Sequence, residues 1–296
     1  MDLEKINEIK KLAIIAMFSD DDLMERLVLK GGNALDIVYE IESRASMDLD
    51  FSMPSDFKPE ELSDLKLRLE NLLKKVFNEN GYEVFDVKFG ERPEVINPNK
   101  LPPPFWGGYE LQFKIIERRK FNEHKNDLQR LRLRAMDIGP GSKKILRVEI
   151  SKWEDCRFKR ERELDNYTIY LYSPEMIVCE KLRAICQQMP EYRTYIGASQ
   201  ATARARDFFD IYTTIKYFKI DLLSAENIQL LKDIFAAKDV AVKLISQVVK
   251  YREDHRSDFI QVESTVKPKV KLKNFDFYFD YVVGTCEKLA KALGVV

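Results

Sequence analysis

The chain has few of the residues from which zinc sites and disulfide frameworks are built. Its 296 residues include four cysteines and two histidines, with no C-x-x-C spacing and no histidine close to a cysteine. Structural zinc and a disulfide framework are therefore not expected, and the default compartment is a reducing cytoplasm. His124 and His255 are isolated in the sequence, so we expect them to be surface residues rather than catalysts.

Long apolar runs are also lacking. The run from Leu12 to Phe18 has only seven residues before an acidic stretch, and the N-terminus is charged. This pattern predicts neither a membrane span nor a signal peptide. Hydrophobic residues make up 45% and charged residues 33% of the chain, which is typical of a soluble globular protein with one large core or two smaller ones.

The zero net charge hides an uneven distribution. Residues 1–62 contain 15 acidic and 7 basic residues, whereas residues 114–162 contain 16 basic and 8 acidic ones. The second region could offer a positive face to a polyanion, or its charges could pair with one another on a solvated surface. Its basic residues include Arg130, Arg132, Arg134, Lys143, Lys144, Arg147, Arg157, Lys159, Arg160 and Arg162.

The stretch from Leu27 to Met53 reads as strand, glycine turn, helix and strand. The apolar run Leu27 to Leu29 leads into Lys30-Gly31-Gly32, and a helix is expected from Asn33 to Glu40. Two adjacent glycines allow a tight turn whose N–H groups can approach an anion, and the following helix points its positive end the same way. Such a turn suits a phosphate.

Two aspartates follow in the second strand of this stretch. Side chains alternate along a strand, so Asp48 and Asp50 are expected on one side and Leu49 and Phe51 on the other, in the core. Paired carboxylates repel each other unless a cation lies between them, and oxygen ligands suit Mg²⁺ or Mn²⁺ bound together with substrate phosphates. Either pattern alone also occurs in ordinary turns and strands. Together they predict a metal–triphosphate site.

In this order, the motifs resemble the active site of polymerase-β-like nucleotidyltransferases. More narrowly, Lys30-Gly31-Gly32-Asn33-Ala34-Leu35 and Arg44-Ala45-Ser46-Met47-Asp48-Leu49-Asp50-Phe51 resemble the AbiEii-type nucleotidyltransferase toxins of bacterial abortive-infection and toxin–antitoxin systems. The resemblance covers residues 27–218 and implies an α/β (α+β) fold in which helices flank a mixed sheet. Two departures are the long spacing from Gly32 to Asp48 and an asparagine, Asn33, where serine or threonine is common.

A third carboxylate is implied by the same resemblance. Residues 144–151 read as a strand in which Glu149 stands opposite Val148 and Ile150. In nucleotidyltransferases of this fold, a carboxylate on a strand beside the Asp-x-Asp strand binds metal and can act as the base. Glu149 is the candidate, and the alternative is an outward-facing glutamate on a half-exposed strand.

Two further motifs lie in the second half of the chain. Ser173-Pro174 predicts the start of a helix, in which Lys181 lies among apolar neighbours. The resemblance implies that Lys181 contacts the triphosphate, although a lysine there could also extend past its neighbours to water.

In a helix expected over 201–218, Asp207 and Asp210 share a face, and Arg206 could form a surface salt bridge with Asp210. The resemblance makes Asp207 functional, either orienting Lys181 or assisting the metals, with Asp210 supporting it.

Periodicity and turn residues predict the remaining elements. Helices are expected over 3–18, 58–80, 120–136, 225–237, 240–251 and 275–293, and strands over 82–89, 109–116 and 167–172. The proline-rich segment 92–108 is expected to be an irregular, substrate-contacting loop, and the basic strip 267–273 a linker or an RNA contact. We expect a catalytic domain over residues 1–172 and a helical domain over 173–296 that contributes to the active site.

The sequence thus predicts transfer of a nucleotide monophosphate from an NTP to an acceptor, implied by the resemblance to be the 3′ end of a tRNA, by a toxin with a cognate antitoxin. The alternatives are transfer to a protein or small molecule, or an inert nucleotide-binding module. The expected metal ligands are Asp48, Asp50 and Glu149, with Lys181 and Asp207 completing the catalytic set. The expected nucleotide-binding residues are Lys30, Gly31, Gly32, Asn33, Ser46 and Lys181.

Overall fold

A computed structural model describes residues 3–41, 44, 46, 48–93, 103–139, 141–198, 200–267 and 269–295. Several residues used in the sequence analysis lie outside the described residues. They are Ala45 and Met47 of the aspartate motif, residues 94–102 of the proline-rich segment, and Pro268 of the basic strip.

A seven-stranded mixed sheet forms the centre of the structure, with the strand order β3-β4-β5-β2-β1-β7-β6. Strand β2 pairs in parallel with β5, and β1 pairs in parallel with β7, whereas the other neighbours are antiparallel. The predicted α/β class with a mixed sheet is confirmed. The strands are β1 Val28–Lys30, β2 Leu49–Ser52, β3 Tyr82–Arg92, β4 Gly108–Glu117, β5 Leu146–Ser151, β6 Arg160–Leu164 and β7 Tyr167–Leu171.

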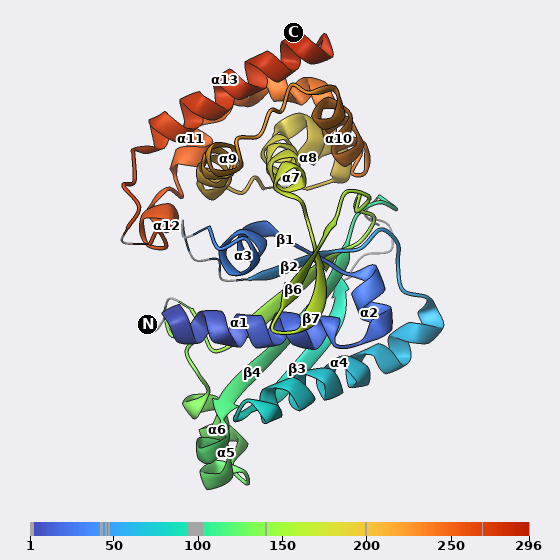
Figure 1. Ribbon diagram of the computed structural model, residues 1–296, viewed down its shortest axis with the longest axis vertical. Coiled ribbons are helices and arrows are strands. Elements are labelled where there is room, and N and C mark those ends of the chain that lie inside the picture. Colours follow the sequence, from blue (N-terminus) through green and yellow to red (C-terminus); the bar gives the residue numbers. More distant parts are fainter. Residues whose placement is uncertain are drawn as a thin grey trace.

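Helices from the first part of the chain cover one side of this sheet (Figure 1). Helix α4 (Pro59–Glu79) is amphipathic and buries Leu65, Leu69 and Leu73 against the core, as its heptad-like spacing predicts. It packs beside α1 (Leu3–Phe18) and strand β3. Along the chain, the helices between α1 and α4 are α2 (Asp21–Arg26) and α3 (Gly31–Asn33), and α3 continues as the π-helix η1 (Ala34–Val38).

The elements that follow β7 in the described part of the chain are helices, and they gather at the opposite end of the molecule (Figure 1). The predicted cap of the first one is confirmed, because the Ser173 hydroxyl accepts a hydrogen bond from the Met176 N–H. The division into domains at residues 172 and 173 stays a prediction. The helices are α7 Pro174–Cys186, α8 Pro190–Ile196, α9 Ala205–Phe218, α10 Ala225–Ala236, the 3-10 helix η3 Val242–Tyr251, α11 Arg252–Arg256, α12 Ile260–Glu263 and α13 Phe275–Leu293.

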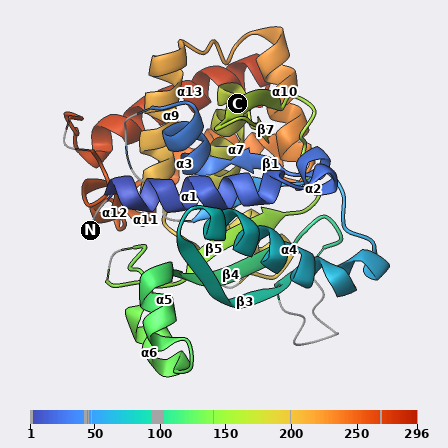
Figure 2. The ribbon, with the colours of Figure 1, turned by 60° about the horizontal axis from the view of Figure 1, so that its bottom comes forward.

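The prediction of a single helix over residues 120–136 is wrong. Two short helices, α5 (Arg118–His124) and α6 (Leu128–Arg134), project together from the end of the sheet (Figure 2). Asp127 breaks the segment because its side chain accepts a hydrogen bond from the Arg130 N–H and so caps a new helix.

Several other elements differ from the sequence-based expectation. Strand β6 and helices α2, α8, α11 and α12 were not predicted, and α9 begins at Ala205 rather than at residue 201. Strand β6 is an edge strand of charged, exposed residues, so it shows no apolar alternation. Strands β3 and β4 are each longer than expected, since Arg92 ends β3 and Gly108 begins β4.

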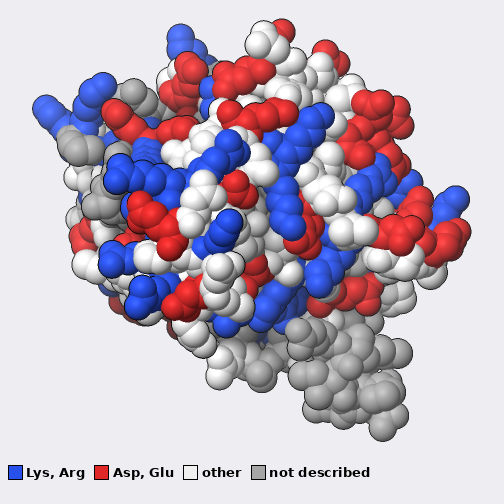
Figure 3. Space-filling view, turned by 90° about the horizontal axis from the view of Figure 1, so that it is seen from below, with Lys and Arg blue, Asp and Glu red and all other residues white. Residues whose placement is uncertain are grey.

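Half of the basic residues singled out in the basic region form ion pairs with acids. Figure 3 shows lysine and arginine intermingled with aspartate and glutamate on the face it presents. Five of the ten basic residues singled out above form ion pairs, which favours the solvated, self-paired surface for these five. The pairs are Arg130–Asp127, Arg132–Asp86, Lys144–Asp137, Arg157–Asp155 and Arg160–Glu175.

The four cysteines are buried and free. Among the described residues, the helices include none that combines the length and the apolar character needed to cross a bilayer.

The expectation that His255 is a surface residue is wrong. Its side chain is only 2% exposed, its Nδ1 accepts a hydrogen bond from the Arg204 N–H at 3.2 Å, and its ring contacts Phe208 with centroids 5.1 Å apart. Burial lowers the pKa of His255 to about 4. The imidazole is therefore neutral in the folded protein at pH 7.

Acid should destabilise the fold through His255. Below the ordinary histidine pKa of 6.5, the His255 imidazole binds a proton in the unfolded chain but not in the folded chain. The free energy of unfolding therefore falls as the pH drops towards 4. The loss is on the order of 3 kcal/mol. In His255→Asn, whose amide oxygen can replace Nδ1 as acceptor, this part of the pH dependence should disappear in urea titrations across that range. His124→Asn in the projecting helix α5 is the control, and an unchanged slope in His255→Asn would contradict the assignment.

Candidate active site

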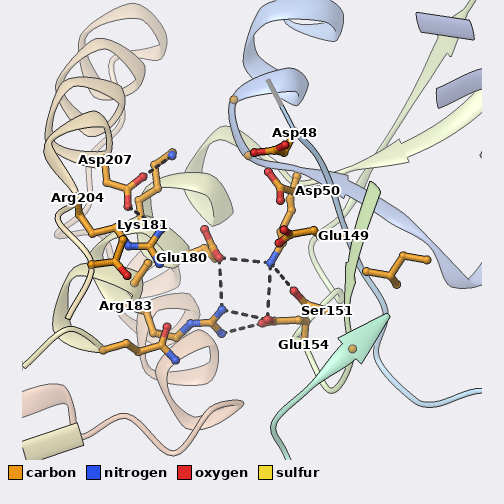
Figure 4. Close-up of a pocket in the computed structure, with 18 of the residues that line it drawn as sticks. Asp48, Asp50, Glu149, Ser151, Glu154, Glu180, Lys181, Arg183, Arg204 and Asp207 are labelled. Atoms are coloured by element: carbon orange, nitrogen blue, oxygen red, sulfur yellow. Dashed lines mark hydrogen bonds and ion pairs between the residues drawn. The ribbon is translucent and has the colours of Figure 1, made fainter. Parts of the chain in front are cut away.

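A cavity of about 670 Å³ lies where the sheet meets the C-terminal helices (Figure 4). Strands β1, β2, β4 and β5 supply one wall, and helices α7 and α9 supply another. Of the ten residues predicted from sequence, all but Asn33 line it. They are Lys30, Gly31, Gly32, Ser46, Asp48, Asp50, Glu149, Lys181 and Asp207.

The acidic residues of the site come from two neighbouring parallel strands. Asp50 on β2 is directly paired in register with Glu149 on β5, and Asp48 precedes β2 by one residue. Leu49 and Phe51 are fully buried in the core, so the alternation along the strand is as predicted. Figure 4 shows the carboxylates of Asp48, Asp50 and Glu149 following one another along the cavity wall.

Crowding of these carboxylates changes their proton affinity. Burial, reinforced by Glu149, Glu180 and Asp48, raises the pKa of Asp50 to about 7, although Lys30 opposes this shift. Burial and the nearby Asp48 also raise the pKa of Glu149. A raised pKa means that the ionised pair is unfavourable without a cation, and a cation bound there would relieve the repulsion.

The donor set suits a divalent cation that also binds substrate. Among the described residues, no group of three or more histidine, cysteine, aspartate or glutamate side chains is close enough to hold a metal ion by itself. Mg²⁺ is usually held by one or two carboxylates together with substrate phosphates and water, rather than by a complete protein cage. The aspartates on β2 offer such a partial set of oxygen ligands, so the residues present fit the metal implied by the sequence.

The glycine turn lies directly against these carboxylates. Gly31 has φ +71°, and a Cβ there would be 2.9 Å from Asp50 Oδ2, while a Cβ on Gly32 would be 2.8 Å from Ser46 Cβ. Side chains at these positions would therefore clash. Helix α3 begins at Gly31, and the N–H groups of a first helical turn lack partners within the helix. The turn can present these N–H groups to an anion.

Asn33 does not reach the cavity. Its side chain is fully buried, and its Nδ2 donates a hydrogen bond to the Asp48 carbonyl at 2.5 Å. The expected contact between Asn33 and phosphate is therefore replaced by a contact that fixes the backbone just before β2. Its Oδ1 is buried without a hydrogen-bond partner among the described residues.

Lys30 lies beneath the carboxylates in a network that sequence analysis missed. Its ammonium is 3.2 Å from Ser151 Oγ, 3.4 Å from Glu180 Oε1 and 3.7 Å from Glu154 Oε1. Burial favours the neutral amine, but Glu180 and Glu154 outweigh it and raise the pKa of Lys30. The ammonium is thus fixed beside Asp50.

Glu154, which follows strand β5, is the centre of this network. It is 5% exposed and accepts two hydrogen bonds from Arg183, at 2.7 and 3.1 Å, with Lys238 Nζ 3.6 Å away. Despite burial, Arg183, Lys30 and Lys238 lower the pKa of Glu154 to about 2. Its partners come from distant segments, and no local sequence pattern signals them.

A second buried network surrounds Lys181. The Lys181 ammonium is 2.8 Å from both Asp207 Oδ1 and Asp210 Oδ2, so the two aspartates share a face as predicted. The suggested surface pair of Arg206 and Asp210 is wrong. Asp210 is 1% exposed and instead receives two hydrogen bonds from Arg44, at 2.7 and 2.5 Å.

These contacts keep Lys181 charged inside the protein. Burial alone would favour the neutral amine, but Asp207 and Asp210 raise the pKa of Lys181 well above its ordinary value. Arg204 completes the group, 3.6 Å from Asp207 Oδ2, and also lines the cavity (Figure 4). Arg44 and Arg204 were not identified from sequence as part of the site.

The fold and the site together define a nucleotidyltransferase: a mixed sheet that places paired carboxylates next to a glycine turn and a buried lysine. The chain belongs to the AbiEii family, because the sequence model described as "Nucleotidyl transferase AbiEii toxin, Type IV TA system" matches residues 13–281. The family is one of toxins from toxin–antitoxin systems, which implies a nucleotide substrate and an antitoxin partner. No curated protein matches the chain in sequence.

Three solved structures align with this one over most of the chain. JHP933 from Helicobacter pylori has a TM-score of 0.50 and 16% identity, over 98% of this chain and 94% of that one. An H. pylori protein named as a proposed nucleotidyltransferase has a TM-score of 0.49 and 17% identity, over 98% and 97%. An antigenic nucleotidyltransferase-like protein from Paracoccidioides brasiliensis has a TM-score of 0.40 and 13% identity, over 88% and 93%.

The buried network around Asp210 should be critical for stability. Asp210→Asn leaves Arg44 and Lys181 buried with less compensating charge, so the free energy of unfolding should fall by about 3–5 kcal/mol. Urea denaturation followed by circular dichroism measures the change. Asp280→Asn is the control, since the Asp280 side chain is 62% exposed in its ion pair with Arg252, and it should cost less than about 1 kcal/mol. Equal effects of the two substitutions would disprove a structural role for the network.

Proposed function

We propose that this chain transfers a nucleotide monophosphate from an NTP to an acceptor hydroxyl, with release of pyrophosphate and dependence on Mg²⁺ or Mn²⁺. One observation carries the proposal: Asp50 and Glu149 are register partners on adjacent parallel strands, and the Gly31–Gly32 turn lies in contact distance of Asp50. A cation site and a phosphate site are thus adjacent. That proximity is what attack on a nucleotide phosphate requires.

The carboxylates divide the chemical roles. Asp48 and Asp50 bind the cation. Glu149, which does not form a three-carboxylate metal site with them in the described structure, accepts the proton of the attacking hydroxyl. When bound, the divalent ion would stabilise the charge that develops on the transferring phosphoryl group. The raised pKa of Glu149 supports its assignment as a proton acceptor, since a base with a pKa nearer neutrality is more effective.

The phosphates are held by the turn and by cations from the helices. Lys181 uses two donors for Asp207 and Asp210, and an ammonium has three, so one remains for a phosphate oxygen. Arg204 lies beside Asp207 at the same wall and offers its guanidinium to the same anion. Gly31, Gly32 and Ser46 approach the phosphates from the opposite side, and Lys30 and Asn33 support this turn from beneath.

The acceptor that we propose is the 3′ end of a tRNA, modified in the cytoplasm, with growth arrest as the result and a cognate antitoxin as the controlling partner. Membership of the AbiEii family supports the toxin role. The sheet part, residues 1–172, and the helical part, residues 173–296, would act as two domains that share the site, because residues from both line the cavity.

Incubation with Mg²⁺, each labelled NTP and either total tRNA or cell extract tests the reaction. Label on tRNA supports the proposal. Label on protein or on a small molecule would show that the acceptor is that molecule and not tRNA. Nucleotide binding without transfer of label would show that the chain is an inert nucleotide-binding module and not an enzyme.

Loss of either aspartate of the metal site should abolish transfer. Asp48→Asn and Asp50→Asn remove a charged ligand while keeping the side-chain size, so the rate of label transfer should fall by at least about 1,000-fold. Circular dichroism should show an unchanged fold. Asp137→Asn, at an exposed ion pair with Lys144, is the control and should keep its activity. Activity within tenfold of the parent in both variants would remove these residues from the mechanism.

Metal removal provides a separate test of the carboxylate site. Chelation with EDTA should stop transfer, and Mg²⁺ or Mn²⁺ added in excess should restore it, because oxygen ligands prefer these hard cations. Calorimetric titration of Mn²⁺ should show binding that strengthens in the presence of NTP. Full activity in EDTA would exclude the proposed metal dependence.

A further inference from the structure

The aromatic residues that line the cavity differ in how much of the ring a ligand could contact. Among the described lining residues, the aromatic ones are Trp106 and Tyr109. Tyr109 is 2% exposed, and its ring is already covered, by Phe89 stacked at 5.3 Å and by the Lys152 ammonium 5.0 Å from the ring centroid. Trp106 is only partly buried. It is therefore the aromatic ring that this lining can offer to a ligand.

The backbone around Trp106 is held firmly in place. Gly107 has φ +110°, and a Cβ on Gly108 would be 1.9 Å from the Ile150 carbonyl oxygen, so the chain leaving Trp106 lies tightly against β5. Before it, the Phe105 carbonyl accepts a hydrogen bond from Lys238 Nζ at 2.9 Å. These contacts fix the indole between the sheet and the helices while leaving part of it exposed, as preorganised binding requires.

Tyr192 connects Trp106 to a polar group of the same cavity. Its ring centroid is 6.2 Å from that of Trp106, and its hydroxyl donates to the Lys238 carbonyl at 2.7 Å. The hydroxyl has one proton, so it must accept in its 3.3 Å contact with Gln187 Nε2. Because Nε2 of the Gln187 amide donates to Tyr192, the amide oxygen Oε1 is the acceptor that Gln187 can offer to a ligand. Gln187 lines the cavity.

We propose that Trp106 stacks on a nucleobase in this cavity and that Gln187 Oε1 accepts a hydrogen bond from an amino group on the edge of that base. The inference rests on the proposed function, which supplies a nucleotide as ligand. Every base has a face that can stack, whereas adenine, cytosine and guanine carry an exocyclic amino group and uracil does not. The base belongs either to the incoming NTP or to the terminal nucleotide of the acceptor.

Tryptophan fluorescence tests the stacking directly, independently of transfer activity. The chain has two tryptophans, and Trp153 lines a different cavity, so Trp153→Phe leaves Trp106 as the only indole. Titration of this variant with each NTP and with an RNA trinucleotide should quench the fluorescence. Quenching by NTP assigns the base to the incoming nucleotide, and quenching by the trinucleotide alone assigns it to the acceptor. Quenching by neither overturns the inference.

Binding constants separate stacking from a structural effect. In Trp106→Leu, the Kd for the quenching ligand should rise roughly 5- to 100-fold, whereas the Kd for inorganic tripolyphosphate, which has no base, should change less than about twofold. Trp106→Phe should retain most of the affinity, and Trp153→Leu is the matched control. Unchanged binding of the ligand, or an equal loss for tripolyphosphate, would overturn the proposal.

Gln187→Leu tests the edge contact. If the base is that of the NTP, the substitution should weaken the binding of CTP and ATP relative to that of UTP. If the base belongs to the acceptor, it should weaken the binding of a trinucleotide that ends in cytidine or adenosine relative to one that ends in uridine. An equal change for all bases would exclude the contact with Gln187. Failure here differs from failure of the proposed function: transfer without any dependence of Kd on Trp106 refutes only the base site, whereas base stacking without transfer refutes only the enzyme.

Discussion

Repulsion between desolvated carboxylates is the constraint on which the site depends. Asp50 and Glu149 face one cavity from adjacent strands, and their raised pKa values report the free energy needed to ionise both. A sheet that placed hydrophobic residues there would be more stable. The chain instead retains the acids and places the Lys30 ammonium beside them, held by Glu180 and Glu154. A further cation bound there would relieve the remaining repulsion, and the proposed chemistry depends on such a cation.

Buried ion pairs join the two halves of the chain around this site. Arg183 on α7 binds Glu154 after β5, and Asp210 on α9 binds Arg44 before β2. Such pairs contribute little net stability, because desolvation offsets their attraction, but a mispaired arrangement would leave a buried charge alone. They therefore favour one placement of the helices against the sheet. The cavity has its shape because the helices and the sheet are held together by interactions that tolerate little displacement.

Local patterns predicted those parts of the structure that local physics determines. Helix α13 begins and ends where periodicity indicated, and the alternation at Asp48 to Phe51 placed two side chains in the core and two in the cavity. By contrast, the partner of Asp210 is 166 residues away in sequence, and that of Glu154 is 29 residues away. Periodicity carries no information about such pairings, and a lone His255 gives no signal of burial. Family resemblance pointed to Lys181, Asp207 and Asp210, but not to Arg44, which pairs with Asp210.

The two walls of the cavity present different charged groups, and their arrangement bears on how a substrate would bind. The strands contribute Asp48, Asp50 and Glu149, whereas the helical part contributes Lys181 and Arg204, both near Asp207. In the proposed function, carboxylates on the strands would hold a divalent ion together with the substrate phosphates, and cations on the helices would hold other phosphate oxygens. Because these groups are fixed relative to one another by the fold, binding would also place the reacting phosphate next to the carboxylates.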